Sequence, residues 1–363
     1  MAADAARSKF DFPWLRPLIV ALIAGVPSGL MFQWLALPLP WVLGPMATLL
    51  VLTLRGVDAA VPDRLRKTAL FFIGGLIGTS FSAHTLDRVG DWPWTLAAMV
   101  VFVLVCGLLG YAVLTRLARF DAKTALYCSL PGGLATMTAL AEATKADVPR
   151  VSLVHGIRVM VIVFAVPLAS TLILNVDRPE GTVAGGDSDP AAIAIFTLIG
   201  LLGLGIAKIM RFPVAYLTGP MTAGALAHLF GWTDATLPAW MQTLCFLVLG
   251  MAIGCRFRGT PLSEIIRISR TAGWLVLLFL LLAGAYSGFV ATFLSLDFVT
   301  VLLAFAPGGV FEMCLIALAL DVDPAFVAFH HLVRLFLILM LAPLVLPKLA
   351  NKLDKAIACR DGT

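Results

Sequence analysis

The sequence predicts an all-α membrane protein made of two repeats with inverted topology, and three observations carry this prediction. First, 60% of the 363 residues are hydrophobic and only 13% are charged, with a mean hydropathy of +0.98, whereas about a quarter of the residues of a soluble domain are charged. Second, apolar runs of about 16 to 25 residues recur along the chain, long enough to cross a hydrocarbon core of roughly 30 Å. Third, the chain repeats its own motifs at a nearly constant offset.

The internal repeat has an offset of about 175 residues. Three segments of the first half return in the second: LPWVLGPM (39–46) as VAYLTGPM (214–221), IGGLIGTSF (73–81) as LGMAIGCRF (249–257), and LPGGLATM (130–137) as APGGVFEM (306–313). Beyond them, the same spacing relates Asp147, His155, Arg158 and Pro167 to Asp323, His331, Arg334 and Pro343.

The repeat divides the chain into three parts. Residues 1–174 are expected to form the first transmembrane repeat, 175–190 an acidic external linker, and 191–363 the second transmembrane repeat with a cytoplasmic tail. Apolar segments of the first repeat lie near 17–34, 39–54, 67–82, 94–115, 122–144 and 151–174. Those of the second lie near 191–207, 212–230, 239–255, 271–293, 299–320 and 325–347.

Basic residues in the loops predict the orientation, because Lys and Arg remain on the cytoplasmic side. Both termini are therefore expected in the cytoplasm of a bacterium, with the protein in the inner membrane. The rule holds at every loop only if 122–144 enters the membrane and returns to the same side. Equivalent loops then have opposite charge bias, as inverted repeats require. We expect five spanning helices and one re-entrant hairpin per repeat. A broken helix that spans the membrane at 122–144 and 299–320 is the alternative.

Two Pro-Gly-Gly triplets interrupt these two runs. Proline lacks a backbone donor and glycine permits unusual dihedral angles, so a continuous helix is not expected there. Irregular backbone at membrane depth needs shelter from protein or a wet cavity, and the half-helix that follows presents free N–H groups. We predict that the triplets line a solute-binding site, although kinks that serve only helix packing are the alternative. The residues are Pro131, Gly132, Gly133, Pro307, Gly308 and Gly309.

A His-x-x-Arg pair follows each triplet, as His155 with Arg158 and His331 with Arg334. The spacing of three places both side chains on one helical face. Each arginine lies roughly 12 to 15 Å into its apolar run, where a charge is costly and function is the default hypothesis. Because arginine can hold a carboxylate or phosphate bidentately, both arginines are predicted to bind the solute. The alternative is an ion pair or a clamp on backbone carbonyls.

Glu312 stands in the first turn of the second half-helix, where the first half-helix has Thr136. We assign Glu312, with His155 and His331, either to coupling or to an ion pair with an arginine. The Thr136 hydroxyl is a candidate solute contact. By contrast, the glycines of the Gly-Pro-Met motifs and of the segments near 74–78 and 250–254 are typical of close helix packing.

The doubled Gly-Pro-Met and Pro-Gly-Gly motifs and the His-x-x-Arg pairs resemble the AbrB family of integral membrane proteins, from about Arg16 to Pro347. Members of that family have an internal duplication and are often labelled as an ammonia monooxygenase or as a regulator of gene expression. They are distinct from the soluble AbrB DNA-binding fold. The resemblance implies a membrane protein of transporter type, without naming a substrate.

The predicted function is secondary transport of a small anionic solute by alternating access, with a proton or sodium as candidate coupling ion. A membrane sensor that regulates gene expression indirectly, without transport, and a channel are the alternatives. The bilayer is the expected partner, and association with further copies of the chain stays open. Neither enzyme activity nor a cofactor, metal or nucleic-acid partner is expected, because the five histidines show no ligand pattern by spacing and no P-loop motif occurs. Only the fold could still combine His155, His331 and Glu312 into a metal site.

Overall fold

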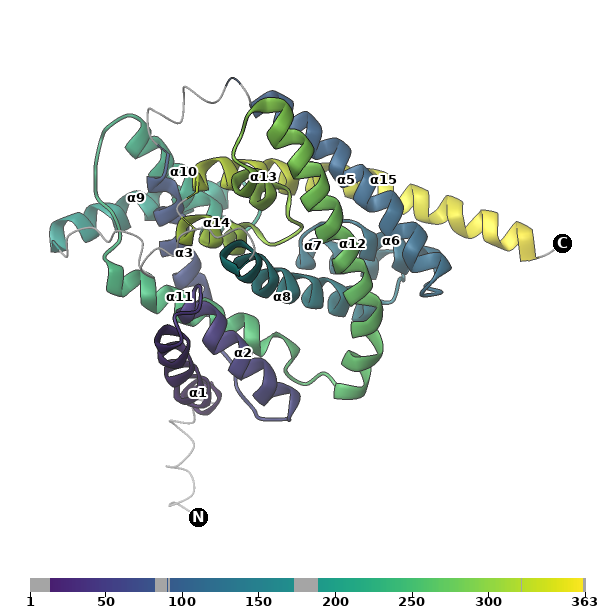
Figure 1. The fold of residues 1–363 in the computed structure, drawn as a ribbon, viewed down its shortest axis with the longest axis horizontal. Coiled ribbons are helices and arrows are strands. Elements are labelled where there is room, and N and C mark those ends of the chain that lie inside the picture. The colour runs from purple at the N-terminus through teal and green to yellow at the C-terminus, as the bar shows by residue number, and fades with distance from the viewer. Residues whose placement is uncertain (1–13, 82–89, 91, 173–188, 321, 362–363) are drawn as a thin grey trace, which may run out of the picture.

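The computed structural model describes residues 14–81, 90, 92–172, 189–320 and 322–361, and these form helices joined by loops, without a strand among them (Figure 1). The predicted linker at 175–190 therefore lies almost wholly outside the described residues. The first half contains α1 (Leu15–Trp34), α2 (Pro40–Leu54), α3 (Asp63–Thr79), α5 (Trp92–Arg116), α6 (Ala122–Ser129), α7 (Leu134–Ala143) and α8 (Val148–Leu172). The second half contains α9 (Pro190–Ile209), α10 (Ala215–Leu229), α11 (Ala239–Gly254), the short 3-10 helix η3 (Cys255–Phe257), α12 (Leu262–Leu294), α13 (Phe298–Phe305), α14 (Val310–Ala319) and α15 (Pro324–Asp361).

The helices of the first half recur in the same order in the second half. The offset between α1 and α9, and between α2 and α10, is 175 residues, and between α6 and α13, α7 and α14, and α8 and α15 it is 176. Even the caps are repeated, because the Asp121 carboxylate accepts from the Thr124 N–H at the start of α6 and the Asp297 carboxylate from the Thr300 N–H at the start of α13. Each helix of one half thus has a counterpart in the other.

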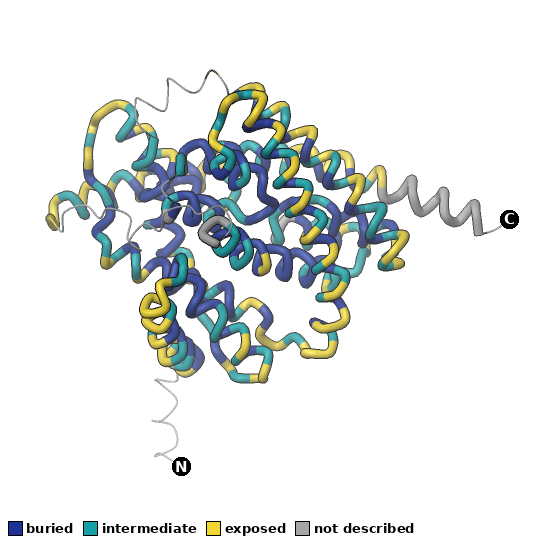
Figure 2. Tube along the Cα trace, viewed as in Figure 1, coloured by how far each residue is buried: buried dark blue, intermediate teal, exposed yellow. Residues whose placement is uncertain are grey.

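The chain is an integral membrane protein. Seven helices of the described part are long and apolar enough to cross a bilayer, namely those at Leu15–Trp34, Trp92–Arg116, Val148–Ala169, Pro190–Ile209, Ala239–Phe257, Leu262–Leu294 and Pro324–Leu349. Along α1, α5, α9 and α12 the exposed positions include large apolar side chains such as Ile23, Leu108, Ile206 and Leu281, and Figure 2 shows the exposed positions on the outside of the bundle. Contact of these apolar side chains with water would be unfavourable, whereas contact with the hydrocarbon chains of lipids would not.

Three of the ten expected spans, those at α2, α3 and α10, are not among these seven helices. The helices α2 and α10 have 15 residues each and α3 has 17, which at 1.5 Å per residue is roughly 22 to 26 Å. Protein surrounds much of them: nine residues of α3, from Ala69 to Gly78, are buried. A helix packed inside protein does not have to match the thickness of the lipid.

Two groups of helices divide the molecule. The helices α1 to α3 pack with α9 to α11, and we call this group the scaffold; α5 to α8 pack with α12 to α15, and we call this group the hairpin bundle. Within the scaffold the repeats exchange partners, because α3 packs on α10 while its counterpart α11 packs on α2. Such reciprocal contacts are typical of a two-fold relation between two units.

Glycine makes the exchanged contacts possible. A Cβ at Gly250 would lie 2.5 Å from the Val42 carbonyl oxygen, and a Cβ at Gly74 would collide with the carbonyl oxygen of Leu217. One turn further on, Gly254 and Gly78 face Met46 and Met221 in the same way. These glycines thus lie at helix crossings where only a hydrogen leaves room for the neighbouring backbone.

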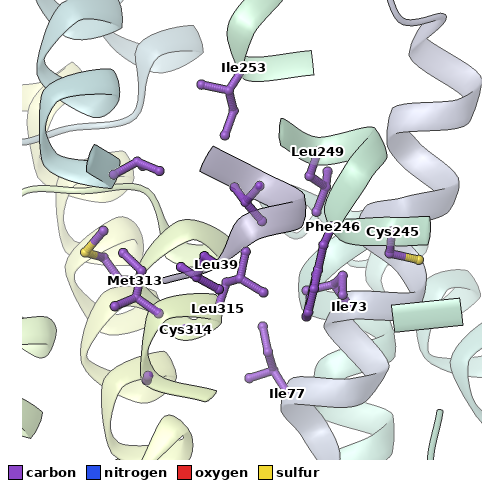
Figure 3. Close-up of a cluster of buried hydrophobic side chains, with 14 of the residues drawn as sticks. Leu39, Ile73, Ile77, Cys245, Phe246, Leu249, Ile253, Met313, Cys314 and Leu315 are labelled. Carbon is purple, nitrogen blue, oxygen red and sulfur yellow. The ribbon is translucent and has the colours of Figure 1, made fainter. Parts of the chain in front are cut away.

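Several helices of the hairpin bundle contribute side chains to the core of the scaffold, and α14 is one of them. Figure 3 shows Met313, Cys314 and Leu315 of α14 among side chains of the scaffold that include Leu39, Ile73, Ile77 and Phe246. Its counterpart α7 instead places Met137 and Ala141 in the core of the hairpin bundle. Of these two half-helices, it is therefore α14 that joins the scaffold core and α7 that does not.

We expect Gly74→Ala and Gly250→Ala to destabilise the fold by about 1 to 3 kcal/mol each, because the added methyl group pushes packed backbones apart. The thermal unfolding midpoint of purified protein in one detergent measures the effect. Gly205→Ala on α9 is the matched control, since a Cβ there meets no atom within 4 Å. Equal midpoints for all three variants would show that the crossings tolerate the methyl group.

Candidate functional site

The chain leaves helical geometry at both Pro-Gly-Gly triplets. Leu130 precedes Pro131 and is extended, with φ −84° and ψ 137°, and Ala306 before Pro307 has φ −49° and ψ 133°, as a residue before proline prefers. Gly133 and Gly309 have φ −69° and −79°. The unusual dihedral angles expected for glycine are therefore absent at these two residues.

Three of these glycines lie where a side chain would not fit, rather than where the backbone needs an unusual dihedral angle. A Cβ at Gly132 would lie 2.6 Å from the Met137 side chain, and a Cβ at Gly308 would lie 2.7 Å from the Met313 side chain, its counterpart. At Gly309 a Cβ would collide with the carboxylate of Glu312. Each methionine, and the glutamate, thus folds back over the loop that precedes its own half-helix.

The open end of the first hairpin is held by one hydrogen bond. The backbone N–H of Asp147 donates to the Thr124 hydroxyl at 3.0 Å. Thr124 is in the first turn of α6, whereas Asp147 follows the end of α7 by four residues, which span at most roughly 14 Å. The end of α7 therefore lies back near the beginning of α6.

His155 and Arg158 of α8 hold the end of α6 and the loop after it. The Nε2–H of His155 donates to the Tyr127 carbonyl at 2.9 Å. The guanidinium of Arg158 donates to the carbonyls of Leu130 at 3.1 Å and Gly132 at 2.9 Å. The Tyr127 carbonyl lies in the last turn of α6 and the other two follow its end, where no intrahelical partner exists and the dipole is negative.

The second repeat contains the same clamp. The Nε2–H of His331 donates to Leu303 O at 2.9 Å, and Arg334 donates to Ala306 O at 2.9 Å and Gly308 O at 2.8 Å. Arg334 also donates to His331 Nδ1 at 2.8 Å. Since Nδ1 accepts and Nε2 donates, His331 is the neutral Nε2–H tautomer in this arrangement.

The clamps place positive charge inside the protein without a matching carboxylate. His155, Arg158, His331 and Arg334 are at most 5% exposed, and the carboxylates of the described residues form no salt bridge with either arginine. The two arginines, from different repeats, lie near enough for their charges to interact. The two guanidinium groups, one bound to each Pro-Gly-Gly loop, therefore lie within electrostatic range of one another.

Glu312 is the buried carboxylate beside the second tip. It is 4% exposed, and its Oε2 has no hydrogen-bond partner. The side chain lies in the first turn of α14, against Gly309, where free N–H groups and the helix dipole favour an anion. Its charge interacts with those of Arg256 and Arg158. The side chain of its counterpart Thr136 lies outside the described part of the chain.

Two further arginines border a recess that the sequence analysis did not assign to a site. Arg66 of α3 and Arg256 of η3 line it, together with Phe311 of α14. The sequence contains one signal that could have found it: Arg256 replaces Ser80 of the first repeat, within an otherwise similar segment. The recess lies where the scaffold meets α14.

Of the residues predicted for the site, the two triplets, the two arginines and the two histidines form two matching clamps, with Glu312 at the second tip. The alternative of a clamp on backbone carbonyls describes both arginines in this arrangement. Within the described ranges, no three His, Cys, Asp or Glu side chains are grouped so that they could hold a metal ion.

Similarity to known proteins covers most of the chain. A family model described as "Transition state regulatory protein AbrB" matches residues 41–350. The chain is 25% identical over 312 residues to "Putative regulator AbrB" of Escherichia coli (strain K12), which covers 85% of this chain and 89% of the relative. It is 27% identical over 288 residues to "Uncharacterized protein YhjN" of Bacillus subtilis (strain 168), which covers 75% of each. The region matched by the family model contains both clamps, Glu312 and the recess.

We expect Arg158→Lys and Arg334→Lys each to lower the free energy of unfolding by roughly 1 to 3 kcal/mol, because an ammonium group cannot reproduce the two-pronged contact and a buried carbonyl loses its donor. Thermal unfolding in detergent measures the loss. Arg267→Lys is the control, since Arg267 is 68% exposed and lies at the long ion-pair distance of 4.0 Å from Glu264. An unchanged midpoint in both clamp variants would contradict the structural role.

Proposed function

Because this chain belongs to the AbrB family and is a helical membrane protein rather than the soluble fold of that name, we propose that it is a secondary transporter that moves a small anionic solute by alternating access. One observation carries the proposal. Each repeat contains a broken helix whose loop is bound by a buried arginine, and the charges of the two arginines interact. Paired broken helices at the interface of two repeats are the usual place of a transport site.

The contacts between counterparts support repeats of inverted topology. Arg66 is in the first turn of α3 and Arg256 directly follows α11, and yet both line one recess. Nearby, the Asp58 carboxylate before α3 pairs with Arg258 after η3 at 2.5 Å. The beginning of α3 thus lies beside the end of its counterpart, so the two run in opposite directions, and the basic residues of both repeats gather at one end. Lys and Arg gathered on one side agree with a cytoplasmic position of that end and of both termini, in the inner membrane of a bacterium.

The bond between Thr124 and Asp147 supports a re-entrant hairpin in the first repeat. In a broken helix that crosses the membrane, α6 and α7 would follow one another, and the beginning of α6 would lie roughly 30 Å from the end of α7 at helical rise. A hydrogen bond of 3.0 Å between these ends agrees with a hairpin that enters and returns. The repeated arginine clamp extends this interpretation to α13 and α14.

Charge supports an anionic solute. The clamps contribute two buried guanidinium groups, and the tips add the N-terminal N–H groups of α7 and α14, all of which favour negative charge. In the second repeat the carboxylate of Glu312 already lies at such a tip. A buried carboxylate with an oxygen that has no partner is suited to take up a proton or a sodium ion, and we assign it to coupling.

A regulatory role without transport is the second candidate, and it is favoured by the names of the family and of the Escherichia coli relative, both of which contain a reference to regulation. In that case the tips would bind a solute as a signal, and no flux would follow. The two candidates differ in one measurable quantity, which is accumulation of solute driven by a gradient.

Uptake by protein reconstituted into phosphatidylcholine vesicles tests the proposal. Labelled lactate, succinate, citrate and phosphate are supplied under an imposed proton or sodium gradient, with protein-free vesicles as the control. A transporter accumulates at least one of these anions only while the gradient lasts. Flux that only follows the concentration of the solute indicates a channel, and binding without flux indicates a sensor; either result overturns the proposal.

We expect Glu312→Gln to lose gradient-driven accumulation by tenfold or more while keeping exchange of labelled for unlabelled solute, because the amide holds neither a proton nor a cation. Both rates are measured in the same vesicles. Glu142→Gln on α7 makes the same chemical change at an exposed position, and it should leave both rates unchanged. If Glu312→Gln accumulates solute like the unmodified protein, another group performs the coupling.

A further inference from the structure

A recess of about 170 Å³ lies between the scaffold and the tip of α14. Its walls come from α3 (Leu70), α11 (Leu249, Ala252 and Ile253) and α14 (Phe311), with the charged side chains of Arg66 and Arg256. It therefore lies where the counterparts α3 and α11 meet, and where the second hairpin touches the scaffold.

The recess has an excess of positive charge. The Arg66 guanidinium pairs with the Asp63 carboxylate at 2.6 Å, and both side chains are about half exposed, at 46% and 55%. Arg256 is exposed as well, and the carboxylates of the described residues form no salt bridge with it. Asp63 is shared with Lys67, so one carboxylate faces three cations, and the guanidinium of Arg256 can still accept an anion at ion-pair distance.

The floor of the recess is apolar. Leu70, Leu249 and Ile253 are at most 4% exposed, and the Phe311 ring adds to them. A recess of this volume is large enough for several water molecules or for a small organic acid. A fully inorganic anion would leave the apolar floor without a partner, whereas a carboxylate with a hydrocarbon part would cover it.

The recess also opens next to the coupling residue. Phe311 immediately precedes Glu312 in the first turn of α14, and the charges of Glu312 and Arg256 interact. A solute carboxylate at Arg256 would therefore compete with Glu312 for the same guanidinium. Binding in the recess and the state of the second tip are thus linked through one arginine.

We infer that this recess is the solute-binding site on one side of the membrane, and that the solute is a small monocarboxylate with an apolar body, held by Arg256 and Arg66 over Leu70, Ile253 and Phe311. The inference rests on the proposed transport function and adds to it a site and a class of substrate. The arginines of the two clamps, whose guanidinium groups are bound to backbone carbonyls, then support the tips instead of holding the solute.

Binding of three probes tests the inference. The full-length protein in neutral detergent is titrated with 4-methylpentanoate, 4-methylpentanamide and malonate, and both calorimetry and the unfolding midpoint are recorded. If the inference holds, 4-methylpentanoate binds and raises the unfolding midpoint more than 4-methylpentanamide, which has no charge, and more than malonate, which has almost no hydrocarbon part. Arg256→Gln and Arg66→Gln should weaken binding of 4-methylpentanoate by tenfold or more. Arg267→Gln, on the exposed surface of α12, should bind it like the unmodified protein.

A second variant tests the site without changing its charge, and its unfolding midpoint shows whether it still folds. Ala252→Leu fills the recess without removing an arginine, and it should abolish binding while its midpoint without ligand stays near that of the unmodified protein. Equal binding by Ala252→Leu and by both arginine variants overturns the assignment of the site but leaves transport untouched.

Two other outcomes also overturn the inference. If the unmodified protein binds none of the probes but takes up an anion of the uptake panel, the class of solute is wrong while the transport function stands. If Arg256 and Arg66 instead govern binding to vesicles of phosphatidylglycerol and not of phosphatidylcholine, the recess holds a lipid headgroup. Absence of both probe binding and uptake of every anion in the panel counts against the transport function itself.

Discussion

The arrangement of this protein depends on one requirement, which is that backbone carbonyls at membrane depth must have donors. Breaking a helix at Pro131 or Pro307 leaves the last carbonyls of a half-helix without partners. A single arginine from the following long helix supplies two donors at each break, and a histidine one turn earlier supplies a third. Without these side chains, buried carbonyls at both breaks would lose donors at membrane depth, which is costly.

The two repeats share their structural contacts and differ in their charged residues. The clamps, the helix caps and the glycine crossings are repeated almost residue for residue. Where the copies diverge, the second gains charge: Glu312 stands in place of Thr136, and Arg256 in place of Ser80. Both lie on the side where α14 packs into the scaffold. The two repeats thus share their backbone arrangement, but only the second has these two charged residues. This difference agrees with the proposal that only the second hairpin contains the coupling group.

The division into a scaffold and a hairpin bundle gives a physical basis for movement. Backbone-to-backbone contacts at Gly74 and Gly250 leave the scaffold little freedom, because close-packed interfaces do not deform continuously. The hairpin bundle touches it mainly through α14 and α15, both of which contact α3. The recess lies at this joint, so that a shift of α14 against the scaffold would change access to the proposed solute site.

The sequence alone determined the membrane class, the duplication, the positions of both helix breaks and the residues of both clamps, because hydropathy, repeat spacing and Pro-Gly-Gly are local signals. It could not determine what the arginines bind, since the carbonyls of Leu130 and Gly132 lie 28 and 26 positions from Arg158, and only folding brings them within hydrogen-bond distance. Likewise, Arg66 and Arg256 read as ordinary basic residues at the ends of apolar runs. The tertiary structure places them in one recess, because α3 and α11 cross with the beginning of one beside the end of the other.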